Sequence, residues 1–286
     1  MTAFKTILVP LDEPSSAPAP LEAAFLLAAR FNAHVTALHV RPDPTLMVPL
    51  VGEGMSGAMV EEMLGMAERQ AGERAGEVRA IYDSVRLGHP LPEATRPPTD
   101  SASCVWREMT GREDDIVTRQ ARLHDLIVMA RPIDHDSAAS NSLNTVLLDS
   151  GKPILLVPSD KRTEIARHVA IAWNGSAEAA RAVAYALPLL AVATKVTILT
   201  AAEKGAEASA GQELADSLAW HGLATNVHTV DAAHHAGPAL LDGAHAVGAD
   251  MLIMGAYTHS RLRQLILGGV TRHVIGHATL PVLLCH

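Results

Sequence analysis

The sequence predicts an α/β protein made of two repeats of one doubly wound domain, each with a five-stranded, mainly parallel sheet and helices on both faces. Short aliphatic runs without strict alternation recur along the 286 residues, as in strands buried on both faces. Segments with helical spacing of apolar residues separate them. The same order of elements begins again at His168, so we expect domains over residues 1–160 and 165–286.

The first repeat opens with a β-α-β unit. Lys5–Leu11 is an aliphatic run, Leu21–Phe31 has apolar residues at helical spacing, and His34–Val40 is a second aliphatic run. Because such crossovers are right-handed almost without exception, the two strands should lie parallel in one sheet. Asp12 then stands at the carboxyl end of the first strand.

A long helix and a methionine stripe follow the opening unit. Ala58–Tyr82 has helical spacing, with Met59, Met63 and Met66 on one side. We expect this stripe in the core, with a lid or a partner groove as the alternative. The rest of the repeat is predicted as a Pro/Gly-rich segment Asp43–Gly57, a loop Leu87–Asp100, strands at Ala102–Glu108, Asp125–Ala130 and Pro153–Val157, and a helix at Glu113–Leu123.

The second repeat presents the same elements in the same order. Its opening strand and helix begin at His168, and Asn174 stands where Asp12 stands in the first repeat. The remaining elements are predicted as strands Lys195–Ala201, Asn226–Val230, Asp250–Met254 and Pro281–Cys285, and helices Ala208–His221 and Pro238–Val247.

Composition disfavours several functions. With 31 acidic and 23 basic residues the net charge is −8, so neither a polyanion-binding surface nor nucleic-acid binding is expected. No apolar run has the length of a membrane span and no secretory signal is apparent, so we expect a cytoplasmic protein.

Cys104 and Cys285 form no C-x-x-C pair and are expected to be buried in strands. Trp106, Trp173 and Trp220 are expected in the core or at an interface.

The loop after the fourth strand of the second repeat is rich in glycine. Asp250–Met254 ends at Gly255, and Gly268-Gly269 directly precede a stretch with helical spacing. Glycine lets backbone N–H groups approach an anion, and a helix N-terminus carries partial positive charge. This strand–glycine loop–helix arrangement is therefore a candidate phosphate site, although glycines at strand ends also serve simply to turn the chain.

The order Gly255, Thr258, Gly268-Gly269-Val270 resembles the nucleotide loop of universal stress protein domains, which is glycine-x2-glycine-x9-glycine followed by Ser or Thr. Thr258 occupies the place of the second glycine and Gly269 that of the hydroxyl residue; Thr271, two residues on, can supply an oxygen. The resemblance covers nearly the whole chain and implies a tandem member with the adenine nucleotide alpha hydrolase-like fold.

The resemblance implies a site for ATP or another adenine nucleotide, with or without Mg, in the second repeat. A protein without a cofactor is the alternative. Asn174-Gly175-Ser176 can instead be only a turn and helix N-cap. The implied adenosine contacts are Ala172, Trp173, Asn174 and Thr200, and the implied phosphate contacts are Gly255, His259, Gly268, Gly269, Val270 and Thr271, with Arg261 and Arg263 as further charges.

The first repeat lacks this loop. Ala130 replaces the first glycine, Ser140-Asn141 replace the glycine pair, and Asp134 and Asp136 would repel phosphate. We therefore expect this repeat to be a degenerate structural partner.

The resemblance also implies that the domains pair through their last strands, Pro153–Val157 and Pro281–Cys285, within one chain or in a homodimer. Edge strands with unpaired backbone groups favour such pairing.

The function implied is stress-response sensing and signalling through nucleotide-dependent contacts with other proteins. The alternatives are a scaffold with a lost site and a carrier or enzyme for another small ligand beneath Trp173. No nucleophile elbow or P-loop is present, so at most slow, incidental ATP hydrolysis is expected.

The chain has 15 histidines, but His273 and His277 lack the H-E-x-x-H pattern, and no metal site is expected.

Overall fold

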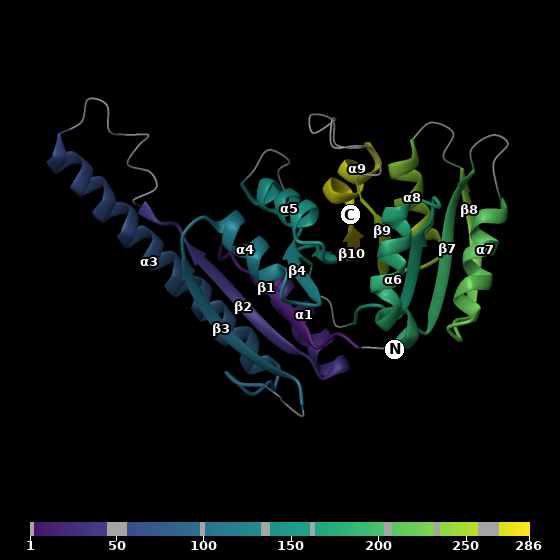
Figure 1. Cartoon of the computed structure of the whole chain (residues 1–286), viewed down its shortest axis with the longest axis horizontal. Coiled ribbons are helices and arrows are strands. Elements are labelled where there is room, and N and C mark those ends of the chain that lie inside the picture. The colour runs from purple at the N-terminus through teal and green to yellow at the C-terminus, as the bar shows by residue number, and fades with distance from the viewer. Residues whose placement is uncertain are drawn as a thin grey trace.

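A computed structural model describes residues 3–44, 56–97, 101–132, 138–160, 164–202, 208–231, 235–256 and 269–286 (Figure 1). The strands are β1 Thr6–Pro10, β2 His34–Arg41, β3 Ser103–Thr110, β4 Leu126–Ala130, β5 Ile154–Val157, β6 His168–Ala172, β7 Lys195–Ala202, β8 Thr225–Asp231, β9 Met251–Gly255 and β10 Val282–Cys285. The helices are α1 Pro18–Phe31, α3 Gly57–Gly88, α4 Glu113–Ala121, α5 Ala138–Asp149, α6 Ala177–Val192, α7 Ala208–Ala219, α8 Ala236–Ala246 and α9 Gly269–His277.

All these strands form one sheet. Their order is β3-β2-β1-β4-β5-β10-β9-β6-β7-β8, and every pair within each half is parallel. Each half is therefore the predicted doubly wound, five-stranded unit. In each half the second and third strands are added on one side of the first strand, and the fourth and fifth strands on its other side. The switch points therefore lie between β1 and β4 and between β6 and β9.

The two halves meet through their last strands. β10 pairs with β5 in antiparallel fashion, with Leu283 opposite Leu155, and both side chains are fully buried. The expected pairing of the terminal strands thus occurs within the chain. It removes two sheet edges that would otherwise expose unpaired backbone groups.

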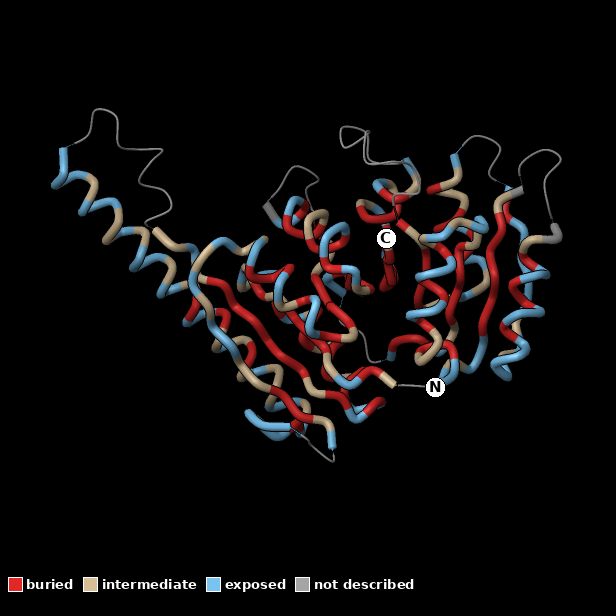
Figure 2. Tube along the Cα trace, viewed as in Figure 1, coloured by how far each residue is buried: buried red, intermediate tan, exposed pale blue. Residues whose placement is uncertain are grey.

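Helices cover both faces of the sheet, and two apolar cores result (Figure 2). On one face α1, α3, α6 and α7 contribute to the first cluster of buried side chains. On the other face α4, α5, α8 and α9 contribute to the second. Neighbouring residues of one strand, such as Ile7 and Leu8, belong to different clusters. The strands are thus buried on both faces, which explains their lack of apolar–polar alternation. Cys104 and Cys285 are buried in strands, as predicted.

Side-chain bonds reinforce the junction between the halves. Arg30 of α1 donates to the carbonyl oxygens of Ile165 and Ala166 and to that of Val192 at the end of α6. Arg131 Nη1 donates to the carbonyl oxygen of Gly276 in α9 at 2.7 Å. Together with the β5–β10 pair, these bonds join the two halves.

The prediction that the methionine stripe lies in the core is wrong. Met59, Met63 and Met66 are 53%, 46% and 49% exposed. The helix extends beyond the predicted Ala58–Tyr82, to Gly88, and its buried residues Ala75, Val78 and Tyr82 all lie in its C-terminal half. The N-terminal half of α3 projects from the body of the protein (Figure 1), so the stripe does not reach the core.

The tryptophans differ in environment. Trp106 and Trp173 are half-buried and pack against the first core cluster, as expected, but Trp220 after α7 is 93% exposed and lies outside the core.

Part of the predicted loop Leu87–Asp100 is hydrogen-bonded to β3. The Cys104 N–H donates to the carbonyl oxygen of Pro92, and the Ala94 N–H donates to the carbonyl oxygen of Cys104. None of the described helices is both long and apolar enough to cross a membrane.

Candidate functional site

The carboxyl ends of β9, β6 and β7 lie side by side at the switch point of the second half, the region where open α/β sheets bind ligands, which we call its crevice. In the strand register Ala172 stands beside Leu199 of β7 and Met254 of β9. Thr200 and Gly255 are the next residues along their strands, and Trp173 continues from β6, with its N–H donating to Leu199 at 2.9 Å. The structure therefore brings together Ala172, Trp173, Thr200 and Gly255, which lie far apart in the sequence.

Asn174 forms a turn that starts α6. Its Oδ1 accepts the Ser176 N–H at 3.1 Å, and the Ser176 Oγ accepts the Ala179 N–H at 3.2 Å. Gly175 has a φ of +69°, a left-handed conformation that glycine adopts without strain. Asn174-Gly175-Ser176 thus forms a turn and a helix N-cap, and a ligand would have to share Asn174 with the turn.

Gly255 lies against the first turn of α6. A Cβ at this position would stand 2.5 Å from the backbone nitrogen of Ala179 and 2.8 Å from the Cβ of Glu178. Close packing between β9 and α6 therefore requires glycine here. This packing role adds to the two roles that the sequence suggested for the residue, a phosphate contact and a turn of the chain.

Thr200 carries a buried hydroxyl. The residue is 5% exposed, and its Oγ1 has no hydrogen-bond partner in the part of the chain that the structure describes. Its methyl carbon would stand 2.8 Å from a Cβ on Gly211 of α7. Burying a hydroxyl without a partner is costly, so this atom is a candidate contact for a bound molecule.

His39 is the counterpart of Thr200 in the first half. The register pairs Thr6 with His34 and His168 with Lys195, which places His39 and Thr200 at the same point of their strands. His39 is 1% exposed, and one ring nitrogen, Nδ1, lies 2.7 Å from the Leu11 carbonyl oxygen. The other, Nε2, is without a partner among the described residues. No local sequence pattern indicates His39 as a site residue, because nothing in its neighbourhood distinguishes it from a core residue.

The helix after the glycine loop begins at Gly269. This residue is exposed, and among the described residues a Cβ on it would meet nothing within 4 Å. Val270 packs against the second core cluster, and Thr271 is 5% exposed in the first turn. The predicted contacts His259 and Gly268, together with Thr258, Arg261 and Arg263, lie outside the described residues.

The crevice of the first half is acidic. Burial, followed by the negative charges of Asp12 and Asp114, raises the pKa of Glu113 to about 7. The Ser142 hydroxyl of α5 donates to this carboxylate at 3.5 Å. The crevice next to β1 would therefore repel phosphate. Asp134 and Asp136, from which the sequence suggested the same outcome, lie outside the described residues, and the sequence did not indicate Glu113.

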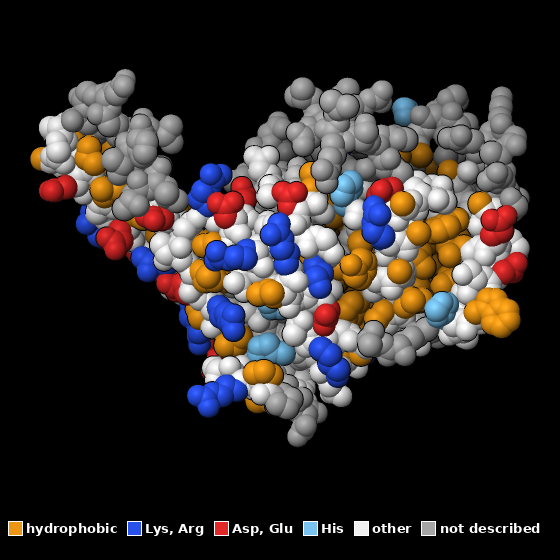
Figure 3. All heavy atoms as spheres, in the orientation of Figure 1, with side chains coloured by type: hydrophobic (Ala, Val, Ile, Leu, Met, Phe, Trp, Pro, Cys, Tyr) orange, Lys and Arg blue, Asp and Glu red, His pale blue; other side chains and the backbone are white. Residues whose placement is uncertain are grey.

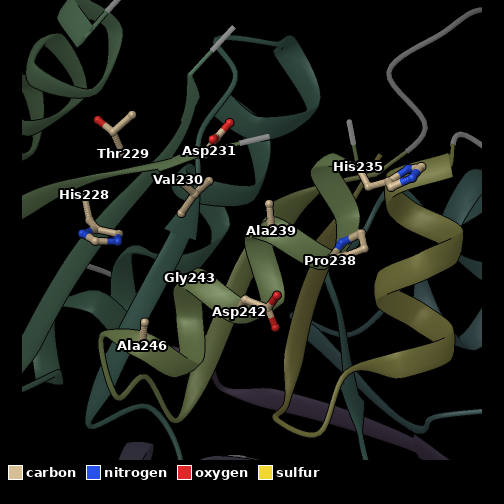
Figure 4. Close-up of a pocket in the computed structure, with 10 residues that line it drawn as sticks. All are labelled: His228, Thr229, Val230, Asp231, His235, Pro238, Ala239, Asp242, Gly243 and Ala246. Atoms are coloured by element: carbon tan, nitrogen blue, oxygen red, sulfur yellow. The ribbon is translucent and has the colours of Figure 1, made fainter. Parts of the chain in front are cut away.

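A concavity also lies between the edge strand β8 and α8 (Figure 4), and its residue Thr229 pairs in register with Thr200. It has a volume of about 530 Å³. Figure 4 shows its side chains spread along the groove rather than converging on one point. The lining residues are His228, Thr229, Val230, Asp231, His235, Pro238, Ala239, Asp242, Gly243 and Ala246.

The described histidines include one close pair, but it is not part of a cluster of metal ligands among the described residues. His273 and His277 of α9 stack with ring centroids 4.2 Å apart, and burial, together with the neighbouring His277, lowers the pKa of His273. Across the described residues, no group of three or more His, Cys, Asp or Glu side chains is arranged to hold a metal ion.

The fold and the two switch-point crevices define a tandem, doubly wound α/β protein. The chain belongs to the universal stress protein family, whose model matches residues 3–158 and 166–286. The chain is similar in structure to a universal stress protein from Archaeoglobus fulgidus DSM 4304, with a TM-score of 0.69, 18% sequence identity, and coverage of 98% of this chain and 97% of that chain.

A functionally unknown protein from Pseudomonas aeruginosa PAO1 is also similar, with a TM-score of 0.58 and 14% identity, covering 99% of this chain and 93% of that one. At these identities the similarity shows the fold alone. The comparison with curated proteins found no match.

Proposed function

We propose that the protein is a cytoplasmic universal stress protein that senses an adenine nucleotide in its second half and signals through nucleotide-dependent contacts with other proteins. The observation that carries the proposal is the meeting of Trp173, Thr200 and Gly255 at one switch point. Ligands of open α/β sheets bind at such points.

The nearby start of α9 supplies the chemistry for phosphate. Its first turn, from Gly269 to Thr271, presents backbone N–H groups and the positive end of the helix dipole. Figure 1 shows α9 beside the carboxyl ends of β9 and β10. The unpartnered hydroxyl of Thr200 can bond a nucleoside at the other end of the crevice. The ligand we infer is ATP or another adenine nucleotide, with or without Mg.

The first half acts as a structural partner in this proposal. Its crevice carries Asp12, where the second half has Asn174, and Glu113 and Asp114 at the start of α4, where the second half has the uncharged start of α8. Like charges would weaken phosphate binding there, so we expect one nucleotide for each chain.

Calorimetric titration with ATP and Mg tests the proposal, after a denatured sample has been analysed for nucleotide already bound. The critical variant is Gly269→Asp. A carboxylate at a helix N-terminus stabilises the helix but repels phosphate, and the open space around Gly269 accommodates the side chain. We expect at least a tenfold loss of affinity, about 1.4 kcal/mol, without loss of stability.

Gly269→Asn is the matched control, because it has the same shape without the charge and should bind nearly as tightly as the wild type. If the wild type neither binds nor carries a nucleotide, the proposal is wrong. The double substitution Thr258→Gly and Gly269→Ser, which restores the family pattern, would then be expected to create affinity, and the protein would be a scaffold whose site has been lost.

A further inference from the structure

The apolar face of α3 continues past the domain. In the C-terminal half of the helix, Ala75, Val78 and Tyr82 are buried, and α3 packs against α1 and β2. At intervals of three and four residues, which keep the same helix face, the series continues toward the N-terminus with Ala71, Ala67, Leu64 and Val60. These four residues are only half-buried. The apolar face of the helix therefore extends past the part that packs into the core of the domain.

Three methionines widen this face. Met59, Met63 and Met66 lie along one flank and are about half exposed. We call the combined surface the α3 stripe; it consists of Met59, Val60, Met63, Leu64, Met66, Ala67 and Ala71. An exposed apolar stripe on a projecting helix marks an interaction surface. Methionine suits such a surface because its flexible thioether adapts to different partners.

The charges beside the stripe are acidic. Glu61 and Glu68 lie along the flank opposite the methionines, by the helical spacing, and both are exposed. Arg74 is held by Glu13, with Nη1 and Oε1 3.3 Å apart, and Arg69 falls on the far side of the helix. Figure 3 shows apolar and acidic side chains together on the projecting end of α3.

This charge pattern selects the partner. Two copies of α3 packed antiparallel would place Glu61 of one copy beside Glu68 of the other, which is repulsive. An anionic membrane surface would be repelled by the same carboxylates. A helix with an apolar face and lysine or arginine along its edges satisfies both the stripe and its acidic flank.

We propose that the α3 stripe binds a basic amphipathic helix of another protein. The stripe from Met59 to Ala71 spans about 20 Å of helix, which is long enough for three turns of a partner. Such a contact is small, so the complex is transient. This proposal does not depend on nucleotide binding, because the surface lies on the other half of the chain.

The test uses two synthetic amphipathic peptides of about 20 residues with the same Leu/Ala face, one flanked by Lys and the other by Glu. Fluorescence anisotropy measures their binding to the full-length protein. We expect the Lys-flanked peptide to bind, the Glu-flanked peptide to bind at least tenfold more weakly, and Met63→Glu to weaken the Lys-flanked peptide at least tenfold.

Ala58→Glu is the matched control. It adds the same charge to α3 on the face opposite the stripe and should leave the affinity unchanged. The double variant Glu61→Lys/Glu68→Lys should reverse the preference toward the Glu-flanked peptide. Equal affinities of Ala58→Glu and Met63→Glu for the Lys-flanked peptide would show only non-specific charge attraction and overturn the proposal. So would failure of the Lys-flanked peptide to bind, or a wild-type dimer in sedimentation that Met63→Glu converts to monomer.

Discussion

Gly255 at the end of β9 lies directly against Ala179 in the first turn of α6, where a Cβ on the glycine would stand 2.5 Å from the alanine's backbone nitrogen. The crevice of the second half depends on this contact, because it sets how closely α6 approaches the switch point. A glycine that resembles part of a phosphate loop therefore also has a packing role.

Gly255→Ala should consequently destabilise the fold. The added methyl group meets backbone atoms that cannot rotate away, and overpacking of this kind costs about 1–3 kcal/mol. Urea unfolding followed by circular dichroism measures the change. The control is Gly269→Ala, whose Cβ enters open space and should be neutral or slightly stabilising. Equal stabilities of the two variants would contradict the packing role.

Thr200→Val should raise the free energy of unfolding in the absence of ligand by up to about 1 kcal/mol, because it removes a buried hydroxyl that has no partner among the described residues. The same variant should bind adenine nucleotide more weakly. Thr200→Ser keeps the hydroxyl and should retain most of the affinity. Destabilisation by Thr200→Val in the absence of ligand would show that the hydroxyl is already bonded.

Glu113→Gln should alter the pH dependence of stability. The pKa of Glu113 is raised from 4.5 to about 7 in the folded protein, so the folded state binds this proton more tightly than the unfolded chain. The resulting stabilisation is complete below about pH 4.5 and is lost as the pH rises through 7.

Relative to the Gln variant, the wild type should therefore lose stability over this pH range, by at most about 3 kcal/mol. Urea unfolding at several pH values from 4 to 8 measures the difference. Glu213→Gln, on the exposed surface of α7, is the control and should show no such trend. Parallel curves for the wild type and Glu113→Gln would contradict the acidic-crevice interpretation.

The β5–β10 junction can be tested by a double-mutant cycle. Leu155→Ala and Leu283→Ala should each cost about 2–5 kcal/mol, since both side chains are fully buried. Because the two residues are opposite each other, their effects should deviate from additivity by about 0.5–3 kcal/mol. Leu8→Ala combined with Leu283→Ala should be additive. Additivity in both pairs would argue against tight packing across the junction.

Local patterns were sufficient to predict much of the fold. Aliphatic runs and helical spacing are properties of neighbouring residues, so β1, β2, β9 and β10 fall within a residue or two of their predicted bounds. The repetition of these patterns predicted two doubly wound units. The resemblance to universal stress protein domains then implied Asn174, Thr200 and Gly255 as site residues.

Other properties depended on tertiary contacts that no local pattern contains. The methionines of α3 have the spacing of a core face, and only the position of α1 and β2 along the helix determines that Met59 and Met63 remain exposed. Glu113 owes its raised pKa to burial and to Asp12, which the fold brings near it from a distant part of the chain.

The sequence by itself determined the α/β class, the two repeats and the strands that end at the crevice. These properties follow from the periodicity of neighbouring residues and from the succession of elements along the chain. Only the tertiary structure decided that Gly255 packs on α6, that Thr200 buries its hydroxyl and that the α3 stripe faces outward. Burial and close contact depend on residues that meet only after the chain has folded.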